Sequence, residues 1–135
     1  MNIGEVAKRS GVPTKTIRYY ESVGLIGPAE RSLRGYRVYG TADVETLRFI
    51  HRARGLGFPV SQVGDLLALW HDRNRASADV KAVALTHIAA IDRKIRELQT
   101  MRDSLTFLAD RCHGDSRPDC PILDDLADGE EIAKK

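Results

Sequence analysis

The chain contains only two cysteines, Cys112 and Cys120, and both lie near its carboxyl end. Seven residues separate them, including Gly114, Asp115 and Pro118, so this segment could fold back and turn both sulfurs toward one ion. Thiolates favour soft cations such as Cu(I), whereas a closed structural zinc site requires about four ligands. The pair is therefore a candidate site for a soft, low-coordinate metal ion.

Three other interpretations of the two cysteines remain open at this level. They are an incidental pair of buried thiols, a reversible disulfide, and one half of a zinc site that a dimer partner completes. His113 is the only imidazole nearby. A spacing of seven residues between two cysteines is by itself a weak indication of metal binding.

A second group of chemically suggestive residues lies in a short basic and aromatic segment near the amino end. It contains Thr14, Lys15, Arg18 and Tyr19. Lysine and arginine contact guanine edges or phosphates, and a tyrosine hydroxyl bonds to phosphate from a stiff side chain. We predict that this segment reads DNA and that further contacts go mostly to phosphate, from Arg31, Tyr36, Arg37 and Arg54.

The alternative for these residues is a solvated charged face with the tyrosines packed in the core. The distribution of charge favours DNA. Residues 1–54 contain ten Lys or Arg against five Asp or Glu, whereas residues 111–135 contain four against seven, although the whole chain carries only +2. We therefore expect nucleic acid at the amino-terminal end.

Several short elements must position the basic residues. Helical spacing from Ile3 to Ser10 ends at Gly11, and a second helix begins with Pro13 and Thr14, with Thr14 as its cap, and stops before Gly24. Residues 31–39 suit a small hairpin that turns at Arg34-Gly35. The pattern predicts a winged helix-turn-helix domain over residues 1–70, within an otherwise all-α chain.

Two more helices complete the predicted domain. One begins at Thr41, as its cap, and reaches about Arg54, and the next runs from Pro59 to about His71. The buried side of the latter is expected to carry Val60, Val63, Leu66, Leu67 and Trp70.

A long helix is predicted over residues 77–110, where no proline or glycine occurs. At ~1.5 Å per residue, it spans roughly 50 Å, more than the globular part requires. Its apolar residues fall at alternating spacings of four and three, which is the seam of a dimeric coiled coil. We call this set the seam: Ala84, Ile88, Ile91, Ile95, Leu98 and, beyond Arg102, Leu105. Residues 111–128 then form the candidate metal-binding loop and a short terminal helix, and residues 129–135 a flexible tail.

Two segments carry a resemblance to a known family. The segment Ile3-Gly4-Glu5-Val6-Ala7, and Thr16-Ile17-Arg18-Tyr19-Tyr20-Glu21 followed by Gly24-Leu25, resemble the opening pattern of the MerR family of bacterial winged-helix regulators. The similarity covers nearly the whole chain and is greatest to the copper-efflux branch. It implies a homodimer with an antiparallel coiled coil on pseudo-palindromic promoter DNA, whose effector-bound form distorts that DNA so that RNA polymerase can engage.

The resemblance also implies an effector. The copper-efflux branch carries two metal-binding cysteines in a loop of this length, and Cys112 and Cys120 match those positions. Divalent-sensing branches carry a third cysteine, from the partner subunit, where this chain has Ser77. The resemblance therefore implies Cu(I), with Ag(I) or Au(I) as mimics, and leaves Ser77 as a helix cap that also neighbours the metal site.

We thus predict a cytoplasmic, Cu(I)-responsive activator of copper-efflux or detoxification genes. Neither an export signal nor a membrane-spanning run is apparent, and no nucleophile with a base or phosphate-binding loop suggests an enzyme. The rivals are a sensor of a divalent metal, of redox state or of an organic cation with the same DNA domain, and, from another class, a copper chaperone or storage protein.

Overall fold

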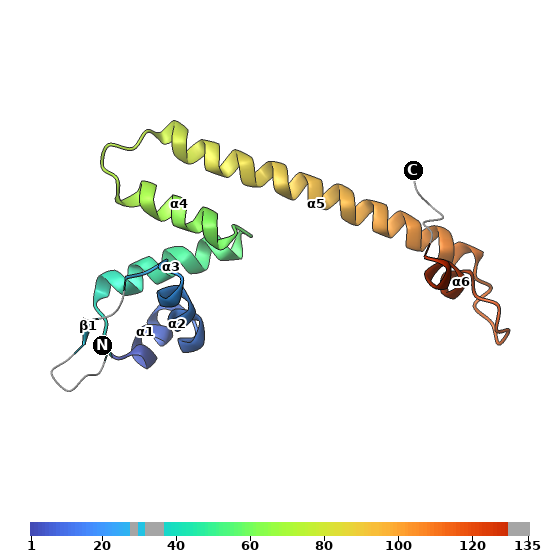
Figure 1. Ribbon diagram of the computed structural model, residues 1–135, viewed down its shortest axis with the longest axis horizontal. Helices are drawn as coiled ribbons and strands as arrows, with labels where there is room; N and C mark the ends of the chain where they lie inside the picture. Colours follow the sequence, from blue (N-terminus) through green and yellow to red (C-terminus); the bar gives the residue numbers. More distant parts are fainter. Residues whose placement is uncertain (28–29, 32–36, 130–135) are drawn as a thin grey trace. The chain divides into compact units, whose positions relative to one another are not determined.

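A computed structural model describes residues 1–27, 30–31 and 37–129, and for residues 30, 31 and 37 the backbone alone (Figure 1). The chain divides into two compact units, Met1–Ala84 and Leu85–Lys135. The elements in chain order are α1 (Ile3–Ser10), α2 (Thr14–Ser22), β1 (Glu30–Arg31), β2 (Arg37–Val38), α3 (Thr41–Gly55), α4 (Val60–His71), α5 (Ser77–Arg111) and α6 (Pro121–Asp128).

The ends of α1 follow from local capping. The side-chain oxygen of Asn2 accepts a hydrogen bond from Glu5 N at 2.9 Å, which satisfies an amide of the first turn. Gly11 adopts φ 78°, and its N–H donates to Ala7 O at 2.9 Å. A left-handed residue at this position ends a helix, and glycine takes it without steric cost. The predicted end of α1 at Ser10-Gly11 is confirmed.

Two predicted caps are wrong by one residue. Thr14 and Thr41 are each the first residue of a helix, and the capping positions belong to Pro13 and Gly40. Pro13 has φ −59° and extended ψ, and its carbonyl accepts from Ile17 N at 3.0 Å, so the helix begins directly after it. At α3, Gly40 N donates to the carboxylate of Asp43, in the first turn of the helix, at 2.8 Å.

The first unit has one hydrophobic core, built where α1 packs on α2 and α3 and where α3 meets α4. Its six largest fully buried side chains are Val6, Val12, Ile17, Leu47, Ile50 and Val63. Leu67 is also buried, as predicted, but Trp70 is 40% exposed. The prediction that Trp70 is buried is therefore wrong; its ring stacks on that of Phe49, with centroids 4.6 Å apart, and stays partly exposed.

The only sheet in the described part of the chain is an antiparallel pair of two-residue strands. Glu30 lies opposite Val38, and Arg31 lies opposite Arg37. This pair joins the two ends of the segment predicted as a hairpin. The predicted turn at Arg34-Gly35 lies outside the described residues. In the part of the chain that the structure describes, the fold is mostly helical.

Most of the second unit is the remainder of α5, whose observed range, Ser77–Arg111, agrees with the predicted 77–110. Five seam residues are exposed by 40% to 57% in the single chain, namely Ile88, Ile91, Ile95, Leu98 and Leu105. Leu108, by contrast, is only 4% exposed, and α6 follows the loop after the end of α5 (Figure 1). None of the helices in the described part of the chain is both long and apolar enough to span a membrane.

Candidate DNA-binding surface and cysteine loop

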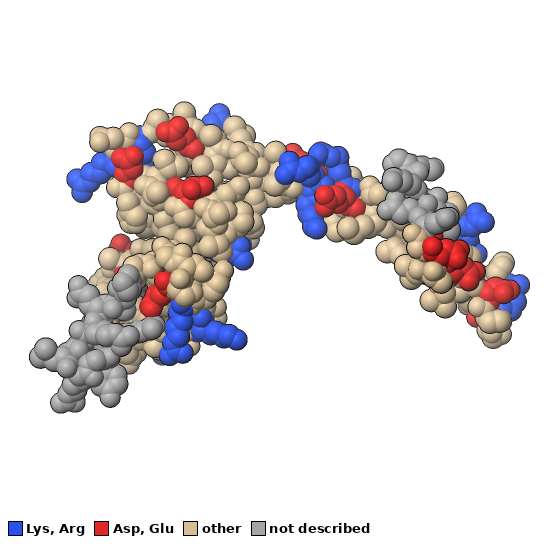
Figure 2. All heavy atoms as spheres, viewed as in Figure 1, with Lys and Arg blue, Asp and Glu red and all other residues tan. Residues whose placement is uncertain are grey.

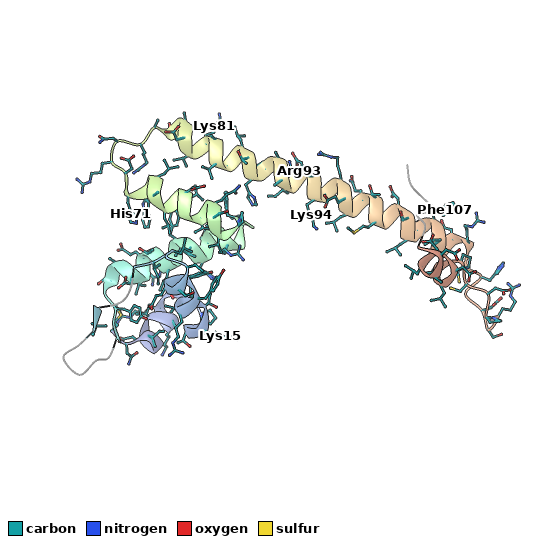
Figure 3. The ribbon with its side chains drawn as sticks, viewed as in Figure 1. Lys15, His71, Lys81, Arg93, Lys94 and Phe107 are labelled. Carbon is teal, nitrogen blue, oxygen red and sulfur yellow. The ribbon has the colours of Figure 1, made fainter. Side chains whose placement is uncertain are left out.

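The short helix α2 separates its core residues from its polar ones. Ile17 and Tyr20 are buried, at 0% and 6% exposure, and anchor the helix in the core. Lys15, Arg18 and Tyr19 are exposed, and Figure 3 shows Lys15 at the margin of the first unit. Because buried and exposed positions alternate with the helical period, anchoring α2 leaves its basic side chains free to meet a ligand. Thr14, in the first turn, is half-buried.

Of the described tyrosines in the first unit, some pack in the core and one is exposed, as a contact to DNA requires. Tyr20 and Tyr39 are core residues, with Tyr39 only 3% exposed, whereas Tyr19 is 51% exposed. Tyr36 lies outside the described residues. The alternative in which tyrosines pack the core therefore holds for two of them, and Tyr19 keeps the predicted role of a DNA contact.

The remaining predicted contacts are arginines. The backbones of Arg31 and Arg37 lie directly opposite each other in the β1–β2 pair. Arg54 is exposed near the end of α3, where its Nη1 donates to Phe58 O at 2.8 Å and ties down the turn before α4. A guanidinium has five N–H donors, so this bond leaves others of Arg54 available to a phosphate.

Several basic side chains lie near the exposed residues of α2. Figure 2 shows Lys and Arg atoms near the position at which Figure 3 labels Lys15. Two acidic groups in the same unit have partners within it: the Glu5 carboxylate lies 3.4 Å from the Arg9 guanidinium, and the Asp43 carboxylate accepts from Gly40 N at the start of α3.

A side-chain hydrogen bond that the sequence pattern does not predict also lies in this unit. The Tyr39 hydroxyl donates a 2.5 Å hydrogen bond to Oε1 of Glu21, in the last turn of α2. The two residues are 18 positions apart, and no local pattern links them. The bond connects α2 to the residue that follows β2.

The two cysteines lie at helix termini in the second unit. Cys112 directly follows α5, and its N–H donates to Ala109 O at 3.1 Å. Cys120 occupies the capping position of α6, before Pro121, and its carbonyl accepts from Asp124 N at 3.1 Å. Both are half-buried and free of disulfide bonds. The sequence pattern did not predict that Cys120 would be the capping residue of the last helix.

The loop between the cysteines carries its own fixed turn. Asp115 accepts hydrogen bonds from the backbone N of Arg117 at 2.9 Å and from its Nε at 2.8 Å, and Gly114 has φ 67°. His113 is exposed. Across residues 1–27 and 37–129, no group of three or more His, Cys, Asp or Glu side chains is placed to hold a metal ion.

The donor set fits the ion predicted from the sequence. Two thiolates around a monovalent ion carry one net negative charge, and the amino end of α6, at Cys120, carries the positive end of a helix dipole.

Ser77 is the first residue of α5, and the carbonyl of the preceding Ala76 accepts from Asp79 N at 3.0 Å. The expected cap at Ser77 is therefore wrong, again by one residue.

The chain is similar to known transcriptional regulators over nearly its full length. A family model described as "MerR HTH family regulatory protein" matches residues 1–69, and one described as "MerR, DNA binding" matches residues 44–108. The chain is 61% identical over 134 residues to the HTH-type transcriptional regulator HmrR of Sinorhizobium medicae strain WSM419, across 99% of this chain and 91% of that protein.

Two further relatives extend the agreement. The chain is 46% identical over 127 residues to the HTH-type transcriptional regulator CueR of Salmonella typhimurium strain LT2, across 94% of this chain and 92% of that protein. The crystal structure of the transcription regulator PbrR691 from Ralstonia metallidurans CH34 in complex with lead(II) is 31% identical, with a TM-score of 0.81, over 93% of this chain and 98% of that one. The chain therefore belongs to the MerR family of helix-turn-helix transcriptional regulators, which are DNA-binding proteins and not enzymes.

Proposed function

We propose that this protein is a homodimeric, Cu(I)-responsive activator that binds promoter DNA and switches on copper-efflux or detoxification genes. The observation that carries the proposal is the pair of free, half-buried thiols at the two helix termini that bound the α5–α6 loop. Two soft ligands match Cu(I), and Ag(I) or Au(I) act as mimics.

The number of thiols supports a monovalent effector over a divalent one. The chain has no third cysteine, and Ser77 stands where divalent-sensing branches of the family carry one. Metal binding within the family is supported by PbrR691, whose structure is that of a complex with lead(II). Cys112 and Cys120 are the proposed ligands, and Ser77 is a neighbour of the site in the dimer.

The DNA side of the proposal rests on α2. Its exposed Lys15, Arg18 and Tyr19, with Thr14, read or clamp the operator, and Arg31, Tyr36, Arg37 and Arg54 hold phosphates. The seam of α5 pairs two protomers as an antiparallel coiled coil, which places two such domains on one pseudo-palindromic site. The domain limits are those predicted from the sequence: 1–70, 77–110, 111–128 and 129–135.

Activation requires that metal binding change the DNA. We infer that the metal orders the cysteine loop and α6, whose Leu123 and Leu126 are 64% and 68% exposed, against the partner's helices. This ordering shifts the angle between the two DNA-binding domains, so that the promoter bends and untwists toward a form that RNA polymerase engages. Hydrogen exchange that leaves the loop amides unchanged on adding Cu(I) would contradict this route.

The proposed effector is tested by anaerobic titration of the reduced protein with Cu(I) against a competing chelator, with Zn(II) in parallel. We expect one tightly bound Cu(I) per protomer and weaker Zn(II), because two thiolates match a two-coordinate soft ion and leave a four-coordinate one short of ligands. Tighter Zn(II), or no binding of either ion, would reject Cu(I) as effector while leaving the family assignment intact.

The DNA surface is tested by Arg18→Ala. Arg18 is exposed on α2 and is proposed to contact a base edge or a phosphate, so its loss is expected to weaken operator binding by roughly 1–3 kcal/mol per protomer. The matched control is Arg73→Ala, which removes an equally charged exposed side chain between α4 and α5. Gel-shift titrations at fixed salt measure both, and equal losses in the two variants would show that only overall charge matters.

A further inference from the structure

The hydrogen bond between Tyr39 and Glu21 joins the two parts of the protein that are proposed to meet DNA. Glu21 lies in the last turn of α2, three residues after Arg18, and Tyr39 lies two residues after Arg37 of β2. The distance from the hydroxyl to the carboxylate oxygen is 2.5 Å, within hydrogen-bonding range. This hydrogen bond connects α2 to the residue that follows β2.

The donor in this bond is held rigidly. Tyr39 is 3% exposed within the core, and its backbone N–H donates to Met1 O at 2.8 Å. Because the ring is packed in the core, its surroundings limit where the hydroxyl can lie. Glu21, at the end of α2, is bound to a fixed point.

The position of Glu21 is electrostatically unfavourable on other grounds. A carboxylate at the carboxyl end of a helix opposes the helix dipole, and here it also stands beside basic residues intended for a polyanion. The other acidic side chains of this region for which partners were described above, Glu5 and Asp43, pair with an arginine and a helix amide. The hydrogen bond from Tyr39 gives this carboxylate a partner.

We propose that Glu21 and Tyr39 are positioning residues that set β2 relative to α2, the two elements proposed to contact DNA. The proposal rests on the proposed DNA-binding function. Two surfaces that must contact one duplex together bind more tightly when their relative placement is fixed in advance, because binding then costs less conformational entropy. Without the hydroxyl, α2 still docks through Ile17 and Tyr20, but the segment that follows β2 loses its side-chain hydrogen bond to α2.

The test is a double-mutant cycle of Tyr39→Phe with Arg37→Ala, read as operator affinity of the full-length protein. Tyr39→Phe keeps the core volume and removes only the hydroxyl. We expect each single variant to bind the operator roughly tenfold more weakly, and Arg37→Ala to cost less than about twofold in the Tyr39→Phe background, since interacting residues are non-additive. Both single variants should also lower the dependence of log affinity on log salt by roughly two units per dimer.

The control is Ser22→Ala, which removes the 2.6 Å hydrogen bond from Ser22 Oγ to Tyr19 O in the same helix turn without touching β2. It should leave the full effect of Arg37→Ala in place. Thermal melts confirm that every variant is folded at the assay temperature, so lost stability cannot imitate coupling. An equal effect of Arg37→Ala in both backgrounds overturns the positioning role while operator binding stands; absence of any operator binding by the unmutated protein overturns the proposed function as well.

Discussion

Replacing either Cys112 or Cys120 by serine is expected to abolish the response to Cu(I). Serine keeps nearly the same volume but supplies a hydroxyl in place of the soft thiolate, and a two-ligand site loses half of its donors. Because loss of an outer-shell partner alone costs about 10–100-fold in metal affinity, loss of a direct ligand should exceed roughly 100-fold. Competition titration with Cu(I) measures this loss, and in-vitro transcription measures the loss of activation.

Operator affinity of the same variants should stay within about twofold of the unmutated protein, because Cys112 and Cys120 lie in the second unit and α2 lies in the first. His113→Ala is the matched control, since His113 is exposed in the same loop and is not a proposed ligand. It should retain both metal binding and activation. Serine variants that bind Cu(I) normally would remove the cysteines from the site, and serine variants that lose operator binding would contradict the separation of sensor and reader.

Ile95→Glu is expected to separate the protein into monomers. Ile95 is 47% exposed in the single chain, so the substitution should cost the isolated helix little. In the proposed coiled coil it places a carboxylate from each protomer in an apolar seam, and burying an unpaired charge costs several kcal/mol. A penalty of about 4 kcal/mol raises the dimer dissociation constant roughly 10³-fold. Sedimentation equilibrium across a concentration series measures it.

Loss of the dimer in Ile95→Glu should also weaken operator binding. Two DNA-binding domains joined in a dimer bind two half-sites more tightly than two separate monomers do, because the second domain binds at a high effective concentration. Ala89→Glu is the matched control: it adds the same charge at an exposed position of α5 that is out of register with the seam. It should remain dimeric. Dimers that persist in Ile95→Glu, or equal dissociation in both variants, would show that the seam is not the interface.

Helix ends and helix lengths that depend on neighbouring residues could be predicted from the sequence. Gly11 ends α1 where it was predicted to, and the absence of proline and glycine after Ser77 gives one helix to Arg111. These features depend on residues within about four positions of one another, which is the reach of helical hydrogen bonds. The misplaced caps at Thr14 and Thr41 are errors of a single residue for the same reason: several neighbouring side chains compete for one helix end.

The exposed face of α2 was likewise predictable, since Lys15, Arg18 and Tyr19 are exposed there, and the roles of these residues and of the two cysteines stay predictions. Only the tertiary structure decided which tyrosines serve the core. Tyr39 becomes buried and binds Glu21 because the segment after β2 is brought against α2. Contacts between residues far apart in the chain depend on how whole elements pack. The packing energy comes from many core residues in separate segments, so no single stretch of sequence predicts these contacts.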